Sequence, residues 1–242
     1  MAYSLAKKHV LNFMSLRTIL LIALFFLFAV LITFPLIISP NSWLVYSDGG
    51  NDIRVSDQAI HVSILADMQK SMYHGKSIWK VLFFNPDYYV SPSYAILGGT
   101  LSFIFPFLIS HNLLLFLFNF LSFLMMYLLA KKITENTIAS IYAAIVFGAS
   151  NFLIHHILDG HGHVTQIYLI PLLFLLIEKM LNNLSLKNAV MLGVFSGIMV
   201  LSCIQYVLYA SLFVPVYVLA RKPKIIINRD FLGLILISVA IA

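Results

Sequence analysis

Long apolar runs, separated by short polar segments, dominate the sequence. They cover residues 18–38, 93–109, 113–130, 137–154, 165–181, 189–220 and 231–242. A helix needs about 20 predominantly apolar residues to cross the hydrocarbon core of a bilayer, and several of these runs approach or exceed that length. The pattern therefore predicts an all-α fold, a polytopic bundle of transmembrane helices.

The composition excludes an ordinary soluble domain. Hydrophobic residues make up 61% of the chain, charged residues make up 10%, and the mean hydropathy is +0.97. In soluble proteins about a quarter of the residues are charged. The net charge of +6 comes from short basic clusters beside apolar runs, which is typical of topology signals and of contacts with anionic membrane lipid. We expect no nucleic-acid partner.

The N-terminal segment carries Lys7, Lys8 and Arg17 before the first apolar run. The run over 18–38 is longer than the core of a cleaved signal peptide, so we expect an uncleaved first helix in a cytoplasmic membrane, with a cytoplasmic N-terminus. Residues 41–92 then form a long extracytoplasmic loop. This loop holds five of the acidic residues, which are Asp48, Asp52, Asp57, Asp67 and Asp87.

The next stretch, PSYAILGGTLSFIFPFLIS at 92–110, is a poor candidate for a straight crossing. If every apolar run crossed once, Lys131 and Lys132 would lie outside, against the positive-inside rule. Gly98, Gly99 and Pro106 also weaken a continuous helix. We therefore expect 92–110 to lie along the outer surface or to be re-entrant, which places the histidine-rich residues 155–166 on the outer face with the first loop.

The run over 189–220 would be about 48 Å long as one helix, which exceeds a bilayer core of about 30 Å. Basic residues follow it, so the charge rule favours an even number of crossings, with a bend near Gln205 and Tyr206. Each of two crossings would be unusually short, so a single long crossing remains an alternative. The last run, 231–242, is too short to span, so we expect the chain to be the N-terminal portion of a longer protein.

Four stretches, in their order over 57–179, resemble the membrane glycosyltransferases of the C-type fold (GT-C). They are DQAIHVSILADMQKSMYHGKSIWK, NPDYYVSPSYAILGG, FLMMYLLAKKITENTIASIYAAIVFGAS and GHGHVTQIYLIPLLFLLIEK. The resemblance implies a single transmembrane module over 1–242. It also implies transfer of a sugar from a polyprenyl-phosphate donor to an extracytoplasmic glycan, lipid or protein acceptor.

By this resemblance the general base is Asp57, in the first loop. The residues themselves leave a second interpretation open, because Asp57 precedes a helical pattern and also suits an N-cap. Asp48 is the alternative base, although Asp-Gly-Gly is a strong turn signal.

Asp159, His161 and His163 are the candidates for donor-phosphate or metal binding. Many GT-C relatives carry a D-x-D or similar acidic pair in this loop, whereas this chain has one aspartate flanked by histidines. The group could hold a divalent ion, because imidazole suits Zn²⁺ while carboxylate suits Mg²⁺ or Mn²⁺. Alternatively, a histidine could contact the lipid phosphate directly. A plain interfacial loop is the third interpretation.

Two other function classes stay open. A transporter or flippase for a lipid-linked or small substrate would place charged residues near the membrane midplane, whereas here the acidic residues lie mostly in loops. A non-catalytic membrane scaffold subunit is the other alternative. Inside the helices, Asn119 and Ser122 are expected to bond neighbouring helices rather than substrate.

Overall fold

The computed structural model describes residues 16–34, 45–46, 54–55, 58–75 and 91–242. Within these ranges the chain is helical apart from turns and one short antiparallel pair, β1 (Val45–Tyr46) with β2 (Arg54–Val55). The predicted all-α class is confirmed. The helices are α2 (Leu16–Ile32), α4 (Gln58–Tyr73), α6 (Pro92–Leu101), α7 (Phe107–Thr134), α8 (Thr137–Gly148), α9 (Asn151–Leu158), the 3-10 helix η1 (Val164–Tyr168), α10 (Leu169–Asn182), α11 (Leu186–Ser202), α12 (Ile204–Arg221), the 3-10 helix η2 (Pro223–Ile227) and α13 (Arg229–Ile241).

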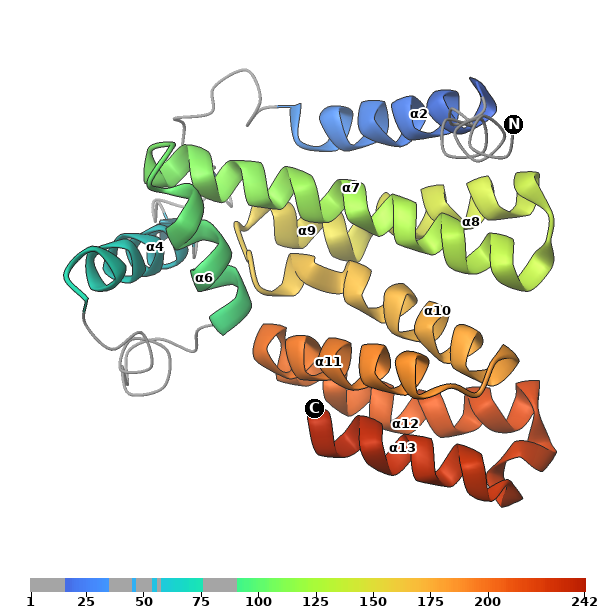
Figure 1. Ribbon diagram of the computed structural model, residues 1–242. Helices are drawn as coiled ribbons and strands as arrows, with labels where there is room; N and C mark the ends of the chain where they lie inside the picture. Colours follow the sequence, from blue (N-terminus) through green and yellow to red (C-terminus); the bar gives the residue numbers. More distant parts are fainter. Residues whose placement is uncertain (1–15, 35–44, 47–53, 56–57, 76–90) are drawn as a thin grey trace, which may run out of the picture.

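The long helices run alternately in opposite directions through the bundle (Figure 1). Four helical stretches of the described chain are long and apolar enough to cross a membrane: Phe107–Thr134, Thr137–Leu158, Val164–Asn182 and Ile204–Arg221. The outer face of α12 is apolar, with Leu212 at 67%, Phe213 at 61% and Val216 at 63% exposure. Apolar faces of this extent are rare on soluble monomers, so they indicate a helical membrane protein whose surface meets lipid.

The pair α7 and α8 packs at close range through a glycine. A Cβ built on Gly148 would lie 2.5 Å from the ring of Phe123, which is fully buried. Asn119 donates a hydrogen bond of 3.0 Å to the Gly148 carbonyl, so its predicted helix-to-helix role is confirmed. Ser122 instead bonds the Phe118 carbonyl of its own helix, at 2.8 Å.

The stretch 92–110 forms no crossing helix. Ser91 caps α6, Pro92 opens it, and the helix ends after ten residues. At 1.5 Å per residue this is about 15 Å, half of a bilayer core. Gly98 and Gly99 do not break the helix but allow α4 to cross it closely: a Cβ on Gly98 would lie 2.3 Å from Leu65. The chain then turns, and α7 begins after Pro106.

The run 189–220 is two helices rather than one. The break lies at Cys203, whose backbone is extended between α11 and α12, slightly before the predicted bend at Gln205. The two helices run in opposite directions beside each other (Figure 1), so the predicted bend is confirmed. The even number of membrane crossings stays a prediction.

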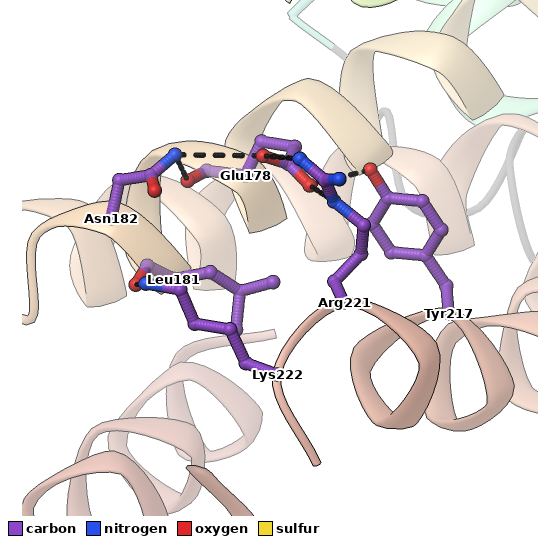
Figure 2. Close-up of polar contacts among 6 residues, drawn as sticks. All are labelled: Glu178, Leu181, Asn182, Tyr217, Arg221 and Lys222. Carbon is purple, nitrogen blue, oxygen red and sulfur yellow. Dashed lines mark hydrogen bonds and ion pairs between the residues drawn. The ribbon is translucent and has the colours of Figure 1, made fainter. Parts of the chain in front are cut away.

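A buried carboxylate joins α10 to the end of α12 (Figure 2). Glu178 is 2% exposed. It accepts hydrogen bonds of 2.7 Å from the Tyr217 hydroxyl and of 2.7 and 3.2 Å from the Arg221 guanidinium. A buried charge is costly unless it is paired and hydrogen-bonded, so these donors hold the two helices in register.

Several basic residues lie at helix ends that Figure 1 places away from α4 and α6. They lie in the last turns of α7, α10 and α12 and at the starts of α11 and α13. These residues are Lys131, Lys132, Lys179, Arg221, Lys187 and Arg229. The opposite end carries α4, α6, α9 and η1, and with them the histidines described next.

Candidate functional site

The site begins at the C-terminus of α9, where the chain reverses sharply. Gly160 adopts a left-handed conformation with φ of 73°. The His161 amide donates to the His156 carbonyl at 2.9 Å, and the Gly160 amide donates to the Ile157 carbonyl at 3.1 Å. These two bonds define a Schellman motif, which satisfies carbonyl groups that the ending helix leaves without partners.

This reversal brings two imidazoles and a carboxylate together. The Nδ1 atoms of His156 and His161 are 2.8 Å apart, and the Asp159 carboxylate lies 3.9 Å from His161 Nδ1. Potential ligand atoms of the three residues all lie within 4.8 Å of one another. On the outer side, His155 Nε2 approaches the Asp159 carboxylate at 3.1 Å. The group is partly exposed, so water and ions can reach it.

A second, buried group lies beside the first and combines three further elements. His61 comes from α4, Tyr94 from α6 and His111 from the first turns of α7. The ring of His61 lies 5.2 Å from that of His163 and 6.2 Å from that of His111, centroid to centroid. The Tyr94 hydroxyl and His111 Nδ1 share a hydrogen bond. His163 therefore links the exposed loop to the interior.

The close fit of this loop depends on Gly162. A Cβ at this position would lie 2.4 Å from the ring of Tyr94. The glycine between the two histidines therefore lets the loop lie directly on α6, with His161 at the exposed group and His163 at the buried one.

Burial controls the charge of His61. Desolvation, together with the neighbouring His111 and His163, lowers the pKa of this imidazole to about 2. His61 is therefore neutral at physiological pH. Within the part of the chain that the structure describes, neither its Nδ1 nor Nε2 of His111 has a hydrogen-bond partner.

A polar network ties α6 to η1 and to the end of α11. Ser93 donates to the Gln166 side chain at 2.9 Å and shares a hydrogen bond of 2.8 Å with Ser202, while Gln166 donates to Ser91 at 2.9 Å. Beside this network is a pocket of about 300 Å³. Its polar lining comes from Ser91, His163, Ser202 and Gln205.

The predicted site residues are divided between two regions and the undescribed part of the first loop. Asp159 and His161 lie together, and the third nearby ligand is His156, whereas His163 faces the buried group. Asp57 and Asp48 lie outside the described residues, so their roles stay predictions.

Sequence reasoning did not find His61 or His111. The signal for His111 was a polar triplet, Ser110, His111 and Asn112, at the start of an apolar run. All three of these side chains are buried. His61 offered no such signal, because a lone histidine in a mixed helix is unremarkable in sequence.

Comparisons with protein-family models, with curated proteins and with solved structures find no match to this chain.

Proposed function

We propose that this chain is the membrane module of a glycosyltransferase. It takes a sugar from a polyprenyl-phosphate donor and transfers it to an extracytoplasmic glycan, lipid or protein acceptor, with Asp57 as general base. In this assignment the histidine-rich end of the bundle faces outward and the basic end faces the cytoplasm, as the positive-inside rule requires.

One observation carries the proposal. Helix α4 begins at Gln58, directly after Asp57 in sequence, and His61 in its first turn packs against His163. The segment that follows the proposed base and the loop proposed for the donor phosphate therefore meet at one end of the bundle. A transferase needs this meeting, because base and leaving group act on opposite sides of the same anomeric carbon.

The available groups suit the substrates. The pocket beside His163 offers hydroxyl and amide groups, which can hydrogen-bond an uncharged sugar. Imidazoles next to it can stabilise the charge that develops on a leaving phosphate, because donors aimed at developing charge are effective in a site that excludes water. The carboxylate of Asp57 would take the proton of the acceptor hydroxyl.

The proposal is tested by sugar transfer from radiolabelled polyprenyl-phosphate hexose and pentose donors, using the full-length protein in membranes. We expect Asp57→Asn to reduce the transfer rate by about 10²–10⁴-fold, since a positioned general base is typically worth that much. Asparagine caps a helix about as well as aspartate, so folding and membrane abundance should stay normal.

Asp48→Asn is the matched control, with a much smaller expected loss. An inactive Asp48→Asn beside an active Asp57→Asn would move the base to Asp48. Wild-type transfer rates in both variants would contradict a general base in the first loop. Substrate flux into vesicles without any sugar transfer would contradict the transferase proposal and favour a transporter.

A further inference from the structure

The Schellman motif at the end of α9 has an unusual pair of side chains. In this motif the residues two positions after the helix cap and three positions before it are neighbours, and they frequently make an apolar contact. Here those positions are His161 and His156, with Asp159 at the cap between them. The backbone reversal therefore brings together three metal-ligating side chains that lie within six consecutive residues.

We propose that His156, Asp159 and His161 bind a divalent transition-metal ion of the Zn²⁺ class. Zinc–nitrogen bonds are about 2.0–2.1 Å long, so two nitrogens on one ion lie roughly 3 Å apart. The Nδ1 atoms of His156 and His161 are 2.8 Å apart, close to that separation. Small side-chain rotations bring the Asp159 oxygen, 3.9 Å from His161 Nδ1, into the same coordination sphere.

The electrostatics of the helix end support a cation independently. The C-terminus of a helix carries partial negative charge, and cations rather than carboxylates are stabilising there. Asp159 places a carboxylate at this end, and its ion-pair partners among the described residues are the histidines His155 and His161. A dication between the three side chains would compensate the helix end and the carboxylate together.

The donor set selects the class of ion. Two imidazoles and one carboxylate suit Zn²⁺, Fe²⁺ or related ions, whereas Mg²⁺ and Ca²⁺ prefer oxygen ligands. His155, 3.1 Å from the carboxylate, would orient it from outside the coordination sphere, as outer partners of metal ligands commonly do. Three protein ligands leave a position open for water or a substrate oxygen. The site does not depend on the proposed glycosyl transfer.

The test is a direct binding measurement on the full chain, purified in detergent and freed of metal by a chelator. Titration with Co²⁺ should give visible absorption bands that saturate at one ion per chain, and Zn²⁺ should displace Co²⁺ while millimolar Mg²⁺ should not. His156→Gln, Asp159→Asn and His161→Gln should each weaken binding by more than about 100-fold, since even outer-shell changes cost about 10–100-fold.

Two histidine variants serve as matched controls. His163→Gln, in the same loop but facing the buried group, and His74→Gln, in the exposed turn directly after α4, should keep the wild-type affinity. Thermal unfolding of the metal-free proteins checks that each variant is folded. Loss of binding in His163→Gln but not in His156→Gln would overturn the ligand set. Absence of saturable Co²⁺ binding to the wild type would overturn the site and leave the histidine pair as a hydrogen-bonded cap.

Discussion

His61 shows how one residue connects two distant parts of the chain. It lies on α4 and is 5% exposed. Its ring is stacked on that of His111 and tilted against that of His163. Because burial holds its pKa near 2, the folded protein keeps this imidazole neutral, whereas the unfolded chain binds a proton below a pH of about 6.5. The contribution of His61 to the free energy of unfolding is therefore fully present above that pH and is lost as the pH falls below it.

We expect the free energy of unfolding to decrease on acidification below pH 6.5, with His61 contributing up to about 1.4 kcal/mol per pH unit. His61→Asn should reduce the slope by the equivalent of one proton. The measurement is denaturant unfolding in mild detergent at pH 7.5, 6.5 and 5.5. His74→Asn, which removes an exposed histidine from the turn after the same helix, should keep the wild-type slope. An unchanged slope in His61→Asn would contradict the neutral, buried state.

At the scale of elements, close approach of helices depends on a few glycines. Gly98 admits Leu65 of α4, and Gly148 admits the ring of Phe123. Phe123 cannot move away easily, because it is fully buried and stacked on Phe25 with ring centroids 6.0 Å apart. The packing of α2, α7 and α8 therefore depends on the absence of a side chain at Gly148.

Gly148→Ala should destabilise the protein by about 1–3 kcal/mol, the usual cost of overpacking a filled core. Gly233→Ala is the control, because no described atom would lie within 4 Å of the added Cβ, and alanine in a helix is favoured over glycine by about 1 kcal/mol. Thermal unfolding of both variants should give opposite signs. Equal effects would show that helix propensity rather than packing governs both positions.

In the part of the chain that the structure describes, the basic residues at the ends of α7, α10 and α12 lie at one end of the bundle, and the histidine cluster lies at the other end, beside α4 and α6 (Figure 1). The separation of Lys131 and Lys132 from residues 155–166 agrees with the expectation from sequence, whereas the side of the membrane that each end faces stays a prediction. The short α6 packs on α4 beside the cluster, and its ten residues are too few to cross a bilayer.

Cysteine labelling tests the orientation of the two ends. In a Cys203→Ala background, His155→Cys should react with a membrane-impermeant maleimide in intact cells, and Lys132→Cys should react only after permeabilisation. Both positions are exposed, so access is set by the membrane. The reverse pattern would place the histidine cluster in the cytoplasm and remove the outer face that the transferase proposal needs.

Several features of this protein are local and could be predicted from the sequence alone. Partition of an apolar run into a membrane depends on about 20 consecutive residues. The sequence therefore predicted the helical class, and it predicted that 92–110 is a poor crossing segment. The nearness of Asp159 and His161 was equally local, because both lie in one helix cap. The exact break at Cys203 was missed by a small margin, since no glycine or proline marks it.

The tertiary structure alone decided which residues meet across helices. His61, His111 and His163 come from three segments separated by dozens of residues, and their contact depends on how α4 crosses α6 and how the 161–163 loop lies on Tyr94. The partner of Asp159 and His161 was decided by the left-handed turn at Gly160, which directs His156 toward them and His163 into the interior. Apolar patterning cannot encode such choices, because it specifies which face of a helix is buried but not which distant side chain it meets.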